Sequence, residues 1–206
     1  MSGRLHRGIG VGALLTGVLG WGMVSAQTQA PPKTSPDTQP AASQPAGGAT
    51  MKLTITSPAF APGQRVPKRH TGEGEDLSPA LAWVGVPPKT AELALIVDDP
   101  DAPPGDWVHW VVYKVPATAA GLAEGRPRTP TLTDPAGAVQ GKNSWGTIGY
   151  RGPMPPTGHG THHYHFKVYA LDTPLSLGPG ATKAEVLAAM RGHILAEGDL
   201  IGTYSR

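Results

Sequence analysis

The sequence lacks cysteine altogether and has few aromatic or charged residues. Its 206 residues include two Phe, 6% aromatic side chains in total and 16% charged side chains. Without cysteine, disulfide frameworks and cysteine-based zinc sites are excluded, so the folded part must be stabilised by its core. No run of Lys and Arg and no nucleic-acid-binding motif is present, and the near balance of 17 basic and 15 acidic residues gives no reason to expect a nucleic-acid partner.

The N-terminus has the pattern of an export signal. Arg4 and Arg7 precede an apolar, glycine-rich run, and Val24-Ser25-Ala26 supplies the small residues that a signal peptidase requires. We therefore interpret residues 1–26 as a secretory signal that sends the protein to the periplasm or outside the cell. An uncleaved N-terminal anchor is the alternative. Cleavage would remove two of the 17 basic residues and none of the 15 acidic ones, which leaves a neutral mature chain without a membrane span.

The remainder divides into a linker and one domain. Residues 27–50 are rich in Gln, Thr, Pro, Ala, Ser and Gly and carry almost no large apolar side chains. Such a segment cannot bury enough surface to offset its ordering entropy, so we expect a disordered linker. Residues 51–206 are then expected to form the single folded domain.

The domain is predicted to be mainly β. Leu53 and Ile55 alternate with polar residues, 93–97 is a continuous apolar run, and 106–116 and 162–172 are rich in β-branched and aromatic residues. One helix is expected where Thr182 and Glu185 have the spacing of a capping box. Its apolar stripe would run through Val186, Leu187, Met190, Ile194 and Leu195, with Gly198 as the C-terminal cap and 199–206 as a short closing strand.

Strand alternation decides which of the clustered histidines can act together. Successive side chains of a strand point to opposite faces, so His162 and Tyr164 share the face of the apolar Phe166 and Val168 and should point inward. His163 and His165 fall on the other face and are expected to be solvated. The same rule groups Trp107 and His109 with Val111 and Tyr113, and it places Trp110 and Val112 opposite.

These segments together resemble the phosphatidylethanolamine-binding protein family, in its bacterial Raf-kinase-inhibitor-like branch. The segments that carry the resemblance occur in family order: "GEDLSPALAW" (74–83), "DDPDAP" (98–103), "DWVHWVVY" (106–113), "GKNSWGTIGYRGPMPPTGHGTHHYHFKVYALD" (141–172) and "GHILAEGDLIGTYSR" (192–206). The resemblance implies a large antiparallel sheet packed on a smaller one, with peripheral helices that include one near the C-terminus. It also implies a small pocket for phosphate-like anions, including phospholipid headgroups.

The resemblance assigns eight pocket residues. Matched position by position to the family motifs, they are Asp99, Asp101, Trp107, His109, Gly152, Pro153, His162 and Tyr164. Asp99 would orient an imidazole or bind an ammonium group, because a carboxylate repels phosphate. His163 stands where the family usually has Arg.

The leading hypothesis is an exported protein that binds a phosphate-like anion or a phospholipid headgroup. We expect no catalytic residues, no bound metal and no cofactor, so the protein would not be an enzyme. A protein-interaction module that inhibits a kinase or peptidase is the main alternative. A metal site, a hydrolase built on Ser144, and core histidines without a ligand remain weaker alternatives, because ligand spacing and a nucleophile motif are lacking.

Overall fold

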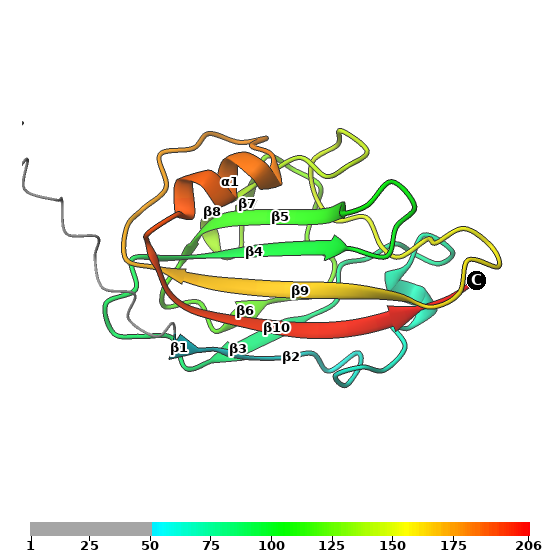
Figure 1. Ribbon diagram of the computed structural model, residues 1–206. Coiled ribbons are helices and arrows are strands. Elements are labelled where there is room, and N and C mark those ends of the chain that lie inside the picture. The colour runs from blue at the N-terminus through cyan, green and yellow to red at the C-terminus, as the bar shows by residue number, and fades with distance from the viewer. Residues whose placement is uncertain (1–50) are drawn as a thin grey trace, which may run out of the picture. The chain divides into compact units, whose positions relative to one another are not determined.

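The computed structural model describes residues 51–206, which form two β-sheets and one α-helix (Figure 1). The large sheet has seven strands in the order β1-β10-β9-β4-β5-β8-β7, and the small sheet has three in the order β2-β3-β6. Strand neighbours are antiparallel except for the parallel pair β1 and β10. The predicted secretory signal at 1–26 and linker at 27–50 lie outside the described residues.

The elements follow one another along the chain with long connections between them. Their bounds are β1 Met51–Lys52, β2 Thr54–Thr56, the 3₁₀ turn η1 Lys68–His70, β3 Leu81–Val84, β4 Glu92–Asp99, β5 Trp107–Pro116, β6 Gly121–Leu122, β7 Thr131–Thr133, β8 Ala136–Gln140, β9 His162–Leu171, α1 Lys183–Met190 and β10 Ile194–Tyr204. Among the described residues, no helix is long and apolar enough to cross a membrane.

The large sheet is covered on both faces. One face packs against the small sheet through a core that includes Val97, Trp110 and Phe166 from the large sheet and Trp83 from the small one. A second core forms on the opposite face, where Val186 and Met190 of α1 cover Ile96 and Val111. Burial on both faces explains why all eight residues of β4 are buried and why its residues 93–97 form a continuous apolar run. The expected large sheet packed on a smaller one is confirmed, and α1 is the one α-helix that residues 51–206 place at its periphery (Figure 1).

Strict alternation fails in β5, and the prediction for its two faces was wrong. Val97 pairs with Trp110 while the next residue, Asp98, pairs with Val108, so β5 carries His109 as an extra residue. This β-bulge puts Trp110 on the same face of the sheet as Trp107, since these residues pair with Val97 and Asp99, which lie two apart on β4. Val111 and Tyr113 accordingly pack under α1, whereas Trp110 and Val112 pack between the sheets.

The C-terminal region also differs from the prediction. The capping box of Thr182 and Glu185 is present, but α1 ends at Met190 and β10 begins at Ile194, so Ile194 and Leu195 belong to a strand. Gly198 lies within β10 rather than at the end of the helix. A Cβ at Gly198 would crowd Leu53, so this glycine allows the close approach of two chain segments and does not cap the helix.

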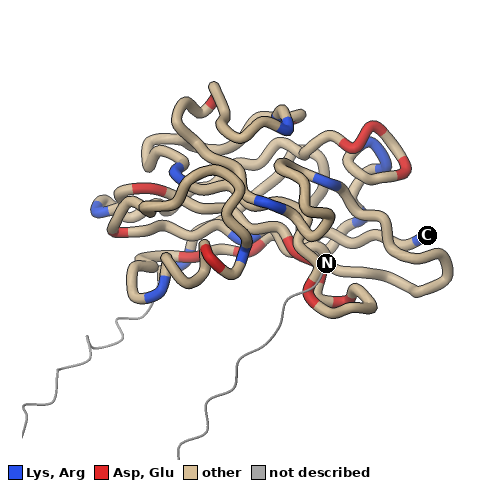
Figure 2. Tube along the Cα trace, turned by 90° about the horizontal axis from the view of Figure 1, so that it is seen from above, with Lys and Arg blue, Asp and Glu red and all other residues tan. Residues whose placement is uncertain are grey.

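Charged residues are distributed over the whole domain. Figure 2 shows basic and acidic positions interspersed along the described chain. One buried carboxylate is prominent on the face of the large sheet that α1 covers. Asp98, which is 1% exposed, pairs with Lys167 at 2.9 Å and with Lys183 at 2.6 Å. These ion pairs lie on the opposite face from the residues that form the site described next.

Candidate functional site

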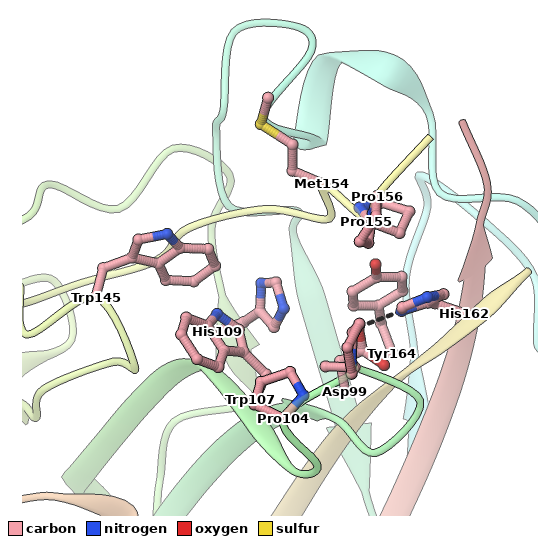
Figure 3. A pocket seen from close by; sticks show the side chains of 12 residues that line it. Asp99, Pro104, Trp107, His109, Trp145, Met154, Pro155, Pro156, His162 and Tyr164 are labelled. Carbon is pink, nitrogen blue, oxygen red and sulfur yellow. Dashed lines mark hydrogen bonds and ion pairs between the residues drawn. The ribbon is translucent and has the colours of Figure 1, made fainter. Parts of the chain in front are cut away.

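A cavity of about 300 Å³ opens where β4 ends and β5 and β9 begin (Figure 3). Because both strands run antiparallel to β4, their first residues lie beside its last ones. Five of the eight predicted site residues line this cavity, namely Asp99, Trp107, His109, His162 and Tyr164. Prolines, Trp145 and Met154 from the loops complete its wall, and none of the lining residues is Lys or Arg.

Asp99 and His162 form a buried pair at the base of the cavity. The Nδ1 atom of His162 lies 2.7 Å from Oδ2 of Asp99, and both side chains are almost fully buried. The other carboxylate oxygen of Asp99 accepts the backbone N–H of Asp101 at 2.9 Å. The carboxylate is thus an acceptor that requires a proton on His162 Nδ1, which orients the ring and leaves Nε2 as its second nitrogen.

His109 is a neutral histidine with one free nitrogen. Its Nδ1–H donates to the carbonyl oxygen of Arg151 at 2.6 Å. Burial lowers the pKa of His109 below its usual value of about 6.5, although the hydrogen bond to Arg151 opposes this shift. With Nδ1 protonated and the ring neutral, Nε2 carries a lone pair and accepts a hydrogen bond.

Tyr164 supplies an unused polar group. It is 1% exposed and lines the cavity, yet its hydroxyl has no hydrogen-bond partner anywhere in residues 51–206. Burial raises the pKa of Tyr164 well above its usual value of 10, and the nearby Asp99 carboxylate raises it further through its negative charge and its attraction for the hydroxyl proton. The hydroxyl therefore keeps its proton at any physiological pH and is available as a donor. An unpaired buried hydroxyl is costly, so a ligand that accepts its hydrogen bond would relieve that cost.

Two tryptophans form an apolar corner of the cavity. The rings of Trp107 and Trp145 meet edge to face with centroids 5.3 Å apart, and Trp145 also contacts His109 at 5.1 Å. Trp145 was not predicted as a site residue. It is presented by a turn in which the side chain of Asn143 accepts the backbone N–H groups of Trp145 and Thr147. Only contacts between distant segments bring this turn to the pocket.

Three predicted site residues do not line the cavity. Asp101 faces outward, where its carboxylate accepts the backbone N–H of His163 and pairs with the His163 ring at 2.7 Å. These hydrogen bonds lower the pKa of Asp101. Gly152 and Pro153 are buried and directly precede Met154, Pro155 and Pro156, which do line the cavity. The Gly152 N–H donates to Asp76 at 2.6 Å, and a Cβ at Gly152 would collide with the backbone of His70.

The two outward histidines of β9 are both paired with carboxylates. His163 is exposed and pairs with Asp101, as described above. His165 is half-buried and pairs with Asp199 of β10 at 2.7 Å, so it is less solvated than predicted. The predicted inward face of His162, Tyr164, Phe166 and Val168 is fully buried, in agreement with the alternation.

A fourth histidine, His159, was overlooked by the alternation argument because it precedes the strand. Its Nδ1 lies 2.8 Å from Nε2 of His162. This residue lies within the segment 141–172 that carries the family resemblance, but only the fold of the 155–161 loop turns it back toward β9. A line of three groups, Asp99, His162 and His159, thus leads from the buried base to the surface.

The geometry also bears on two weaker alternatives, a metal site and a hydrolase built on Ser144. No group of three or more His, Asp or Glu residues in 51–206 is arranged to hold a metal ion. The hydroxyl of Ser144 accepts the backbone N–H of Val108 at 2.8 Å and has a structural role in joining the 143–147 turn to β5.

Comparison with known proteins identifies the family. The family model described as phosphatidylethanolamine-binding protein matches residues 56–205. A UPF0098 protein of Methanothermobacter thermautotrophicus is 51% identical over 154 residues, covering 75% of this chain and 99% of the other. A Mycobacterium tuberculosis protein named as a candidate lipoprotein, LppC, is 40% identical over 210 residues and matches 99% of both chains.

Solved structures show the same relationship. Escherichia coli YbcL, described as a new member of the mammalian PEBP family, superimposes with a TM-score of 0.70 at 36% identity, covering 75% of this chain and 99% of that one. The PEBP homologue CT736 of Chlamydia trachomatis gives a TM-score of 0.68 at 41% identity, covering 76% and 99%. With the family model spanning nearly the whole described domain, this chain belongs to the phosphatidylethanolamine-binding protein family.

Proposed function

We propose that the protein binds a small phosphate-like anion, such as the headgroup of a phospholipid, in the cavity at the ends of β4, β5 and β9, and that it acts as a binding protein rather than an enzyme. The observation that carries the proposal is the Tyr164 hydroxyl, which is buried, protonated and without a partner in residues 51–206. A phosphate oxygen is a strong acceptor for such a donor.

The other polar atoms of the cavity define the ligand further. His109 is neutral and offers a lone pair on Nε2, so it favours a ligand that also donates a hydrogen bond. A singly protonated phosphate monoester has both an acceptor oxygen and a P–OH donor. None of the lining residues is Lys or Arg, so the hydrogen bonds to an anion would come from Tyr164 and the two histidines.

The apolar part of the cavity is consistent with an amphipathic ligand. Trp107, Trp145 and Met154 lie on one side of the polar base, and Trp145 and Met154 are exposed at its rim (Figure 3). Such a wall can hold the carbon atoms next to a phosphate while the phosphate reaches Tyr164 and His109. A headgroup and a free phosphomonoester share this chemistry.

A calorimetric titration tests the proposal. Glycerol phosphate, phosphoethanolamine, inorganic sulfate and free ethanolamine would be titrated into the wild-type protein and into Asp99→Ala and His162→Ala. We expect saturable binding of the phosphomonoesters, little binding of ethanolamine, and loss of binding in both variants while the fold is retained. Absence of saturable binding of any phosphomonoester at millimolar concentration would refute the proposal.

We also propose that the protein is exported. The support is the signal-like pattern of residues 1–26 together with the lipoprotein name of the Mycobacterium tuberculosis relative, which matches nearly the full length of this chain. Inhibition of a kinase or peptidase is a second candidate function. The exposed apolar side chains of Trp145 and Met154 favour it, since they could contact a protein partner. In that case Met154→Ser would abolish inhibition of the target, whereas Tyr164→Phe would weaken anion binding and leave the inhibition unchanged.

A further inference from the structure

His159 occupies the nitrogen of His162 that a ligand would need. Asp99 engages Nδ1 of His162, so any hydrogen bond between His162 and an anion must use Nε2. In the free protein His159 Nδ1 lies 2.8 Å from that atom. The two rings meet edge to face with centroids 5.0 Å apart, which fits a direct nitrogen–nitrogen hydrogen bond.

The number of protons on the two rings decides whether His159 and His162 can stay in contact. An N···N hydrogen bond holds one proton between the two nitrogens. When both rings are neutral, His159 Nδ1–H donates to the lone pair of His162 Nε2, because His162 already uses its proton on Asp99. One added proton can be accommodated on either ring. A second added proton would place two N–H groups against each other, so the doubly protonated pair must separate.

We propose that His159 is a gate residue of the anion pocket: it occludes Nε2 of His162 in the free protein and must leave it before an anion can bind there. This inference rests on the proposed anion-binding function. Once His159 has left and His162 is protonated, Nε2–H becomes a donor directed at the ligand. The Asp99 carboxylate accepts the Nδ1 proton on the other side of the ring and holds the ring in place.

The loop that carries His159 is built to allow the exchange. His159 is exposed and lies between Gly158 and Gly160, both at positive φ (+77° and +95°), where a Cβ would have no atom within 4 Å. Arg206, which follows β10, holds the loop at two points: its carbonyl accepts the Gly158 N–H at 3.2 Å, and its side chain donates to the Pro155 carbonyl at 3.3 Å. The His159 N–H donates locally to the carbonyl of Pro156. Rotation about the glycines can therefore move His159 without disturbing the core.

Other ionisable side chains lie around the pair of His159 and His162. Asp99 on β4 contacts the Nδ1 side of His162, and Asp101 in the following turn pairs with His163. Tyr164 stacks 6.4 Å from the His162 ring and remains neutral. Arg206, whose backbone joins the loop, directs its charge to Glu73 at 3.3 Å. None of these groups replaces His159 at Nε2.

The test compares His159→Ala with a matched control, His165→Ala. His165 is likewise a histidine whose ring has a side-chain partner, the carboxylate of Asp199 at 2.7 Å, but it lies on the opposite face of β9 from His162. Sulfate is the probe, because its charge is constant over the pH range used. Removing the competing contact, which has the net strength of an ordinary hydrogen bond, should lower the Kd for sulfate at pH 7.5 about 2- to 10-fold. The control should bind sulfate like the wild type.

Imidazole ¹⁵N NMR of the ligand-free proteins gives an independent readout. In the wild type, His162 should be protonated on Nδ1 with an accepting Nε2, and the Nε2 resonance should move in His159→Ala and stay in place in His165→Ala. Weaker or unchanged sulfate binding by His159→Ala, or an unmoved Nε2 resonance, would overturn the gate while leaving the proposed function intact. If neither wild type nor variants bind sulfate or phosphomonoesters, the proposed function fails and the gate with it.

Discussion

Replacing Tyr164 by Phe should separate binding from stability. The substitution removes one hydroxyl that has no partner in residues 51–206 and leaves the ring in the core. A buried hydroxyl without a partner costs about 1–3 kcal/mol, so the free energy of unfolding of the ligand-free protein should stay constant or rise by about 1 kcal/mol. For a domain of this size such a gain corresponds to an increase in Tm of about 2–4 °C.

The same substitution should weaken anion binding. A hydrogen bond to a charged group contributes about 1.5–3 kcal/mol, so the Kd for glycerol phosphate should rise about 10- to 150-fold. Differential scanning fluorimetry without ligand measures the first effect, and isothermal titration calorimetry measures the second.

Tyr150→Phe is the matched control. Tyr150 is equally buried, but its hydroxyl donates to the carbonyl of His70 at 2.7 Å. Its removal should lower the free energy of unfolding by about 1–3 kcal/mol, because that carbonyl loses its donor, and should leave anion affinity nearly unchanged. If Tyr164→Phe destabilised the ligand-free protein as much as Tyr150→Phe, or bound glycerol phosphate as tightly as the wild type, the reasoning about the Tyr164 hydroxyl would be wrong.

Three further predictions concern pH, the helix and export. Burial lowers the pKa of His109 in the folded protein. As the pH falls below about 6.5, the unfolded chain therefore takes up a proton on His109 before the folded chain does, and the free energy of unfolding should decrease. Sulfate binding favours the protonated ring and should tighten over the same range, and His109→Gln should flatten both trends; a sulfate affinity independent of pH would contradict this. Thr182→Ala removes the side chain that accepts the Glu185 N–H and should cost about 0.5–2 kcal/mol in urea denaturation, whereas an unchanged midpoint would show that the cap contributes nothing. N-terminal sequencing of the protein from its native host should begin at or near Gln27, and an intact Met1 in a soluble cytoplasmic fraction would refute export.

The sequence alone determined the features that depend on local pattern. Leu53 and Ile55 are both buried, as their alternation predicted. The inward face of 162–168 and the capping box at Thr182 were also found correctly, because each depends only on residues within a few positions of one another. The family resemblance then supplied the architecture, and five of the residues it assigned lie around one cavity.

The tertiary structure decided what depends on registration between distant segments. The bulge at His109 is visible only in the pairing of β5 with β4, and it is what lets His109 and Trp110 break the alternation. Ile194 joins β10 rather than α1 because pairing with β9 offers it a strand neighbour, which an amphipathic pattern cannot reveal. The isolation of the Tyr164 hydroxyl and the contact of His159 with His162 likewise arise from loops folding over β9. Local pattern reports which face a side chain takes, whereas the partner it meets is set by chain segments far away in the sequence.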